Sequence, residues 1–565
     1  LVDQFLNNLE LPLDLSNNNN YLTYLLRLNY IPYEIHDSIC FWLNLSKWIK
    51  DKVSSDIFYH RLYRDEKILV TPGYVLGHKH GYFRVRYNFS NCKIYKIVEG
   101  IKNTLAKTNT EYLLDYHQHI YSDNSNISNT IFNLLDEKYI NYKPIGERHP
   151  FIFYMGHIPA FSRNIINQIY NINLEETPFN NMFLRGIDPN LRTGEVHDNS
   201  IDNIKKKVGH INYPTTDEIS LFKRETEQQI ANIIRNNLES GLKISPKTNI
   251  IYEHEWMHQE TTMYLFQKLN LNFFNKTELE NLISKLPKLK LNLSEINVDW
   301  IKLPSSIIQR GVNKEEDKYY QDNEIGISKI NMPDLMMTKY PITNNQFKIF
   351  IDNGGYQTEE FWEKEHWKWI QSKNIILPES WERKDNNTLI RFPLRIVKLN
   401  EVLDHPCNVS LAEAFAFTKW YSKNNNLDGS VRIPSEEEWL QAIEKRGDNI
   451  PELYLREPSN TNQLGKVMET RQIISNKYLE NSCGISHLVG NAWEMTSSKF
   501  KPFPGFVREQ YYPEYSTDFF DNYHYVLKGA SWATPKHLIR PSFRNFYQDL
   551  YRYNITQFRM VMDVV

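Results

Sequence analysis

The sequence predicts an α+β protein in which a mainly helical N-terminal half precedes a C-terminal half of short strands, helices and loops. Two observations carry this prediction. Helical periodicity dominates as far as residue 286. From there to Val565 the pattern changes to short apolar runs, many tryptophans and tyrosines, and turn residues at irregular spacing, which is typical of an α+β domain.

The change of pattern divides the chain into three expected parts. Residues 1–145 are expected to be a helical N-terminal region of unknown role. Residues 146–290 contain two long helical patterns, one following Gly156-His157 and one running from Asp217 past Lys268, which indicate a helical bundle. Residues 291–565 are expected to form the α+β part.

Charge, hydropathy and cysteine content exclude several classes of protein. The 565 residues carry 66 Lys and Arg against 68 Asp and Glu, so we expect neither nucleic-acid nor membrane-surface binding. No uninterrupted apolar stretch is long enough to span a membrane and no secretory signal is visible, so a cytoplasmic location is expected. Neither a disulfide framework nor a thiolate zinc site is indicated, because the cysteines lie far apart without a CxxC pair. They are Cys40, Cys92, Cys407 and Cys483.

The sharpest local signal is a pair of histidines inside a helical pattern that reads EHEWMHQE over 253–260. His254 and His258 are four residues apart, which places both imidazoles on one helix face, able to bind one metal ion. As His-Glu-x-x-His the pattern fits a zinc protease with Glu255 as general base. As His-x-x-x-His-x-Glu it fits a mononuclear iron site in a helical bundle. A pair of surface histidines is a third interpretation.

A third ligand separates these interpretations. The residues after His258 lack the Gly-x-x-His continuation of the metzincin zinc proteases. Three downstream carboxylates are weak substitutes: Glu278, Glu280 and Glu295. Upstream, the segment RHPFIFYMGHIPAF at 148–161 places His157 in an apolar helical pattern of the same predicted bundle. His157 is therefore a candidate third ligand.

Three sets of motifs together resemble one protein family. The first two are the Gly-His segment at 148–161 and His-x-x-x-His-x-Glu at 254–260. The third is an ordered series of C-terminal segments: PITN (341–344), GGY (354–356), RIPSEEEW (432–439), GNAWE (490–494), KGASWAT (528–534) and FRNF (543–546). In this combination the chain resembles the nonheme iron sulfoxide synthases of thiohistidine biosynthesis, which make the precursors of ergothioneine and ovothiol. The resemblance covers about 145–565 and implies a DinB-like helical domain followed by a formylglycine-generating-enzyme-like, C-type-lectin-like domain.

The resemblance implies an iron(II) site with three histidine ligands, which map onto His157, His254 and His258. Three neutral imidazoles leave positions open for a thiolate, the substrate imidazole and O2. Glu260 follows His254 by six residues and cannot share its helix face, so we expect it to hold or orient a ligand. The two cysteines of the C-terminal half do not match the copper-binding pair of formylglycine-generating enzymes, so cysteine-based copper chemistry is not expected.

The resemblance also implies residues that act on the substrates. Tyr512 and Tyr515 match the family's paired tyrosines, one of which donates a proton or hydrogen atom during the reaction. A second segment matches the part that grips the amino-acid end of the histidine derivative, by bonding its carboxylate or by cation–π contact with a trimethylammonium group. Its residues are Arg544, Asn545, Phe546 and Tyr547.

The implied reaction joins the sulfur of cysteine, or of a cysteine-containing thiol, to the imidazole ring of a histidine derivative and oxidises the sulfur to a sulfoxide. The stretches at 183–189 and 197–200 are similar to eukaryotic-type ergothioneine enzymes and favour hercynine. The segment from 367–369 to 393–394 is similar to ovothiol members, which prefer unmethylated histidine. Met257 stands where bacterial ergothioneine members often carry a glutamine that bonds the imidazole. Hercynine is the favoured substrate, histidine is the alternative, and a zinc metalloprotease is a more distant alternative.

Overall fold

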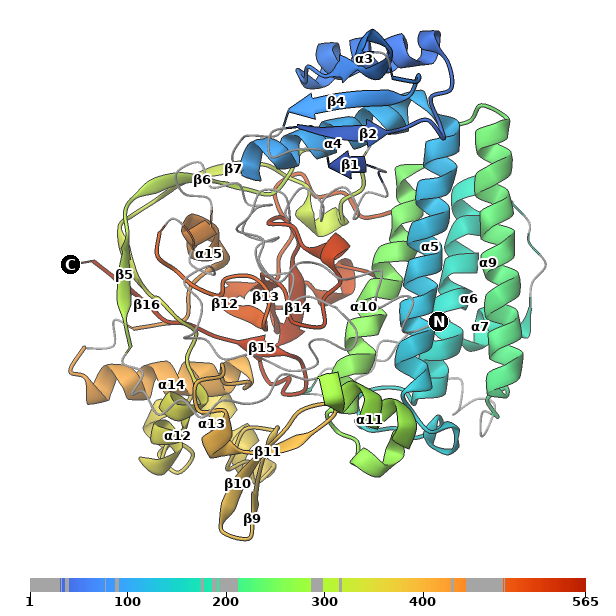
Figure 1. Ribbon diagram of the computed structural model, residues 1–565. Coiled ribbons are helices and arrows are strands. Elements are labelled where there is room, and N and C mark those ends of the chain that lie inside the picture. The colour runs from blue at the N-terminus through green and yellow to red at the C-terminus, as the bar shows by residue number, and fades with distance from the viewer. Residues whose placement is uncertain are drawn as a thin grey trace. The chain divides into compact units, whose positions relative to one another are not determined.

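The computed structural model describes residues 31, 33–35, 40–76, 78–86, 91–172, 174, 177–184, 191–192, 212–285, 298–314, 318–427, 431–443, 481 and 483–564 (Figure 1). The chain forms two compact units, the first made of residues 1–126 and 227–245 and the second of residues 127–226 and 246–565. Helices and short sheets are both present, which confirms the α+β fold class. None of the helices in the described ranges has the length and apolar character needed to cross a membrane.

The first unit combines helices with a four-stranded antiparallel sheet of order β1-β2-β4-β3. Apolar side chains alternate along its strands, and Leu43 and Phe83 are buried. Phe58 of α3 packs on Phe83, with ring centroids 4.8 Å apart. Residues 1–145 therefore contain a sheet as well as the expected helices. The sequence did not indicate the sheet, because its strands are too short for an alternating apolar pattern to be recognised. The elements are β1 (Tyr33–Ile35), β2 (Cys40–Asn44), α3 (Lys52–Glu66), β3 (Thr71–Pro72), β4 (Tyr82–Arg86), α4 (Asn91–Thr108), and parts of α5 (Thr110–Asn133) and α9 (Thr216–Glu239).

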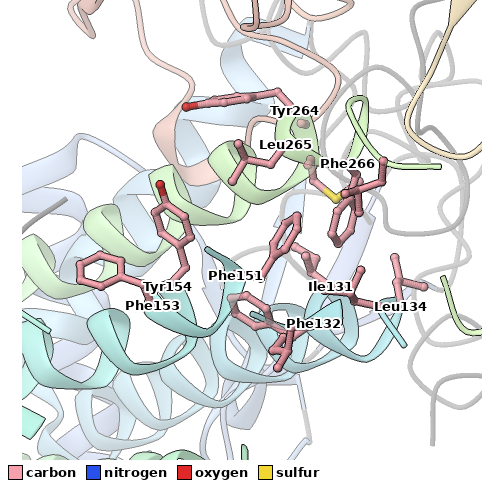
Figure 2. Close-up of a cluster of buried hydrophobic side chains, with 14 of the residues drawn as sticks. Ile131, Phe132, Leu134, Phe151, Phe153, Tyr154, Tyr264, Leu265 and Phe266 are labelled. Atoms are coloured by element: carbon pink, nitrogen blue, oxygen red, sulfur yellow. The ribbon is translucent and has the colours of Figure 1, made fainter. Parts of the chain in front are cut away.

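The helical part of the second unit is built around α6 and α10, which run side by side (Figure 1). Figure 2 shows how Phe151 of α6 and Phe266 of α10 meet Ile131 and Phe132 from the end of α5 in a buried apolar cluster. Both helices are buried around most of their circumference, and the buried side chains of α10 include Glu253, Glu255 and Glu260. The helices of this part are α6 (Phe151–Tyr170), α7 (Pro178–Met182), α10 (Asn249–Phe266) and α11 (Lys276–Lys285).

The helix boundaries differ from those expected in two places. The pattern from Asp217 past Lys268 is two helices, because Gly241 adopts a φ of +75°, in the left-handed region that ends helices, and Pro246 begins a separate turn. Gly156 and His157 lie inside α6 rather than at its start, since the helix begins after Pro150.

The C-terminal part of the second unit contains four small sheets within the described residues, with orders β11-β10-β9, β14-β13-β12-β15, β16-β8-β5 and β6-β7. A fully buried ion pair between Arg559 and Glu494 joins the chain end to β12, with 2.7 Å between Nη2 and Oε1. The helices are α12 (Asn344–Asp352), α13 (Lys364–Ser372), α14 (Leu411–Asn424) and α15 (Glu436–Ile443). The strands are β5 (Trp300–Leu303), β6 (Ser306–Arg310), β7 (Ser328–Met332), β8 (Leu335–Thr338), β9 (Trp381–Lys384), β10 (Asn387–Arg391), β11 (Ile396–Lys398), β12 (Trp493–Lys499), β13 (His524–Lys528), β14 (Asn545–Gln548), β15 (Thr556–Gln557) and β16 (Val561–Asp563).

Candidate metal centre

Helices α6 and α10 bring three histidine side chains to one point. The Nε2 atom of His254 lies 3.1 Å from Nε2 of His157 and 3.1 Å from Nε2 of His258. One ligand atom from each ring lies within 4.8 Å of the others, so the three are placed as a group that can hold one ion. Two nitrogens bound at about 2.1 Å and at right angles to each other are separated by about 3 Å, which matches this spacing.

The orientation of His157 is fixed by the segment that follows α7. Its Nδ1 lies 2.7 Å from the carbonyl oxygen of Phe183. A carbonyl only accepts, so Nδ1 carries the proton and Nε2 presents a lone pair to the cluster. Gly156 makes this contact possible, because a Cβ at this position would lie 2.4 Å from Cε2 of the Phe183 ring. Gly156 and His157 therefore act together: Gly156 leaves room for the Phe183 side chain, and the backbone carbonyl of Phe183 orients His157.

His254 is oriented by stacking rather than by a hydrogen bond. Its ring lies parallel to Phe161, one helical turn beyond His157, with centroids 3.5 Å apart and an interplanar angle of 9°. The Nδ1 atoms of His254 and His258 have no hydrogen-bond partner among the described residues.

The three rings are electrically neutral at ordinary pH. Burial lowers the pKa of His157 to about 4. Burial, reinforced by the neighbouring histidines, holds the pKa values of His254 and His258 well below the usual range. Neutral imidazoles with converging lone pairs repel one another unless a cation or a proton lies between them, and burial disfavours the proton. The donor set therefore fits a divalent metal ion.

We expect Gly156→Ala to weaken metal binding. The added methyl group must displace the Phe183 ring, and with it the carbonyl that orients His157. Loss of such an outer partner typically lowers metal affinity by about 10- to 100-fold. A titration with Co²⁺ or Fe²⁺ measures the effect. Gly146→Ala is the control, because a Cβ there meets no atom within 4 Å. Equal affinity in the two variants would show that the Phe183 contact is dispensable.

Glu260 is bonded to the C-terminal part instead of to a histidine. Its carboxylate accepts hydrogen bonds from Trp493 Nε1 at 2.6 Å, Ser531 Oγ at 2.7 Å and Thr534 Oγ1 at 2.8 Å. Burial raises its pKa, against these three bonds. These bonds fasten α10 to the GNAWE and KGASWAT segments, and the expectation that Glu260 holds or orients a ligand stays a prediction.

We expect Glu260→Ala to lower the free energy of unfolding of the second unit by about 2 kcal/mol or more, because three buried donors lose their acceptor. Denaturant unfolding followed by tryptophan fluorescence measures the change. Glu280→Ala, at an exposed side chain of α11 whose nearest cation is Lys276 at 4.0 Å, is the matched control and should be nearly neutral. A shift of similar size in both variants would argue against the anchoring role.

Glu255 lies on the face of α10 that meets α5. Its Oε1 accepts a hydrogen bond from Ser128 of α5 at 2.6 Å, and Ser128 also accepts from Gln259 at 3.1 Å. Glu255 and Gln259 are four residues apart and share a helix face that packs on α5. A general base must reach the water that it activates, so this geometry disfavours the zinc-protease interpretation. Of the three carboxylates considered as a third zinc ligand, Glu295 lies outside the described residues.

Tyr512 and Tyr515 lie beside the cluster. The Tyr512 ring is 5.9 Å from the ring of His254 and 4.8 Å from Phe161, and it packs on Tyr515 at 5.4 Å. The hydroxyl of Tyr515 donates to Met257 Sδ at 3.5 Å, a weak acceptor. Burial and nearby carboxylates raise the pKa of Tyr515 well above its usual range, so the phenol keeps its proton.

The four expected substrate residues are placed unequally. Arg544 is buried, and its guanidinium bonds Glu436 at 3.0 Å and the carbonyl oxygens of Asn323 and Lys501 at 3.1 and 3.0 Å, so its contacts are those of a structural arginine rather than of a substrate carboxylate site. Asn545 accepts from the backbone N–H of Phe546, whose ring lies 5.8 Å from Tyr515. Tyr547 stacks on Tyr551 at 5.1 Å.

Sequence analysis missed a buried charge network next to the cluster. The guanidinium of Arg540 donates to Glu253 at 2.8 and 3.0 Å and to Glu324 at 2.9 Å. Glu253 precedes His254 directly and lies two turns before Glu260, on the same side of α10. The available signal was the position of Glu253 directly before a candidate metal ligand in a helical pattern.

Two further expectations concern the cysteines of the C-terminal half and the segments that favoured hercynine. Cys407 is buried and forms no disulfide with another described residue. Burial raises the pKa of the Cys407 thiol well above its usual range, which disfavours a metal-binding thiolate. The segments 185–189 and 197–200, which favoured hercynine, lie outside the described residues.

Residues 301–564 match the family described as the sulfatase-modifying factor enzyme 1-like domain, so the C-terminal half is a domain of that family. This confirms the formylglycine-generating-enzyme-like domain that the motifs implied.

Similar proteins extend the relationship to the helical half. The chain is 26% identical over 456 residues to "Ergothioneine biosynthesis protein 1" of Schizosaccharomyces pombe, covering 76% of the chain and 53% of that protein. It is 29% identical over 261 residues to "Hercynine oxygenase" of Mycobacterium tuberculosis, covering 45% and 58%, and 27% identical over 331 residues to "Hercynine oxygenase" of Mycolicibacterium thermoresistibile, covering 56% and 68%. These relatives confirm the resemblance to enzymes of ergothioneine biosynthesis. The chain spans 53% to 68% of the length of these relatives.

Proposed function

We propose that the chain is an iron(II)- and O2-dependent sulfoxide synthase that joins the sulfur of cysteine, or of a cysteine-containing thiol, to the imidazole ring of a histidine derivative. Hercynine is the favoured derivative, in keeping with the names of the relatives. The observation that carries the proposal is the convergence of His157, His254 and His258 beside Tyr512.

The proposed reaction is balanced without an external reductant. One thiol, one imidazole C–H and one O2 give the imidazolyl sulfoxide and one water. The thiol loses its S–H hydrogen, the ring loses its C–H hydrogen, and both leave as water with one oxygen atom. The second oxygen atom stays on sulfur. The two substrates supply all four electrons that O2 takes up.

The residues of this chain have separate tasks in the proposal. His157, His254 and His258 hold iron(II), which when bound supplies O2 activation and a common binding point for both substrates. Tyr512 or Tyr515 delivers a proton or hydrogen atom; burial keeps Tyr515 protonated for this purpose. Phe546 and Tyr547, whose rings lie near Tyr515 and Tyr551, are proposed to contact the histidine derivative together with Asn545.

The test is anaerobic loading of the purified chain with Fe²⁺, followed by O2, cysteine and either hercynine or histidine, with products identified by mass. A coupled sulfoxide from hercynine supports the proposal. A coupled product from histidine alone moves the assignment to the ovothiol type. Retention of zinc with no consumption of O2 would contradict the proposal.

A further inference from the structure

The loop that carries Tyr512 and Tyr515 has no covalent neighbour in the helices that carry the histidines, so something must set the distance between them. The structure assigns this task to the buried turn at residues 321–324. Every residue of this turn is at most 3% exposed. On one side it contacts α10, and on the other it contacts the tyrosine loop.

The contact with α10 is ionic. Arg540 bridges Glu253, the residue before His254, and Glu324 of the turn, with donor–acceptor distances of 2.8 and 2.9 Å. Gln321 of the turn adds a direct bond to Glu253 at 2.7 Å. Breaking a buried, fully paired network of this kind is costly, so the turn is held rigidly to the helix.

The contact with the tyrosine loop is made by Asp322. Its Oδ2 accepts from the backbone N–H of Glu509 at 3.2 Å, and its Oδ1 accepts from the hydroxyl of Ser516. Asn323 also donates to Ser516 Oγ at 3.0 Å. These two anchor points flank Tyr512 and Tyr515, one on each side.

The loop between the anchor points is closed on itself. The carbonyl oxygen of Pro513 accepts from Arg508 Nε at 2.9 Å and from Thr517 Oγ1 at 2.8 Å. These bonds tie both ends of the loop to Pro513, which lies between the two tyrosines, so the anchors at Glu509 and Ser516 help to place both rings. We propose that Asp322 is a positioning residue, which holds the tyrosine loop at a fixed distance from the histidine cluster so that a phenol reaches the substrates. The catalytic part of this proposal rests on the proposed function.

The test combines a measurement that needs no reaction with one that does. In Asp322→Ala, backbone amides of residues 509–517 should exchange with deuterium about 10- to 100-fold faster, as expected from loss of a charge-assisted hydrogen bond. Asp322→Asn keeps one acceptor oxygen and should show a smaller change. Fe²⁺ affinity should stay unchanged, because the partners of the Asp322 side chain within the described part of the chain are Glu509 and Ser516 and not a histidine. The product ratio should shift from the coupled sulfoxide toward cysteine sulfinic acid.

Asp521→Asn is the matched control. This carboxylate also accepts from backbone N–H groups, those of Tyr523 at 2.8 Å and His524 at 3.0 Å, but these partners lie at the end of the same loop. It should change neither exchange at 509–517 nor the product ratio.

Several results would overturn the inference: unchanged exchange in Asp322→Ala, faster exchange with an unchanged product ratio, or parallel loss of Fe²⁺ binding, which would indicate general loosening. If the unmodified chain forms no coupled product, the proposed function fails. Exchange then decides the anchoring, since faster exchange supports it and unchanged exchange refutes it.

Discussion

Replacing His157 with alanine is expected to abolish stable iron binding and, with it, the coupled product. The three imidazoles approach one another closely and are neutral, so removal of one leaves two ligands on a single helix. Even the loss of a partner outside the ligand set costs about 10- to 100-fold in affinity, so the loss of a ligand should exceed 100-fold. Metal analysis after dialysis, together with product mass, measures both effects.

His119→Ala controls for loss of a histidine as such. His119 is exposed on α5 and bonds a carbonyl oxygen of its own helix at 2.6 Å, so its variant should keep iron and activity. Full iron retention in His157→Ala would show that His157 is not a metal ligand.

Replacing Tyr512 or Tyr515 with phenylalanine should leave iron binding intact and damage the chemistry. Each change removes only a hydroxyl, and both rings keep their packing against Phe161, Phe546 and each other. Loss of a positioned proton donor typically lowers the rate by about 10²- to 10⁴-fold. With the donor absent, the thiol can still be oxidised, so the product should shift from the coupled sulfoxide toward cysteine sulfinic acid.

Tyr511→Phe, in the same loop, is the control and should behave as the unmodified chain. Rates and product ratios of all three variants identify the donor. An unchanged rate and ratio in both Tyr512→Phe and Tyr515→Phe would show that the two phenols only pack.

The histidine cluster was predictable because two of its members share a helix face by spacing alone. His254 and His258 follow from the periodicity of α10, and His157 from a second apolar helix in the same part of the chain. The local sequence pattern could not show that the three imidazole rings meet, because His157 lies on a different helix from the other two. The identity of the metal ion as iron remains a prediction.

The partners of buried charges were not predictable, because they lie far away in sequence. Glu260 finds its donors more than 230 residues later, and Arg544 bonds a glutamate 108 residues earlier. The resemblance to the family implied that Arg544 contacts the substrate. In the structure its guanidinium is buried against Glu436, which is the environment of a structural arginine. In the first unit, strands of two to five residues were too short to compete with the helical pattern around them.

The burial of α10 limits how this protein can be altered by engineering. From Glu253 to Glu260, successive side chains meet different neighbours: Arg540 at Glu253, Phe161 at His254, Ser128 at Glu255, Tyr515 at Met257 and Trp493 at Glu260. Substitutions on either turn of this segment of α10 therefore disturb a specific contact. The helix cannot be exchanged for that of a relative unless residues scattered over four hundred positions are exchanged with it. New substrate preferences are therefore more accessible through the tyrosine loop and the Asn545–Tyr547 segment than through the helix that carries two of the histidines.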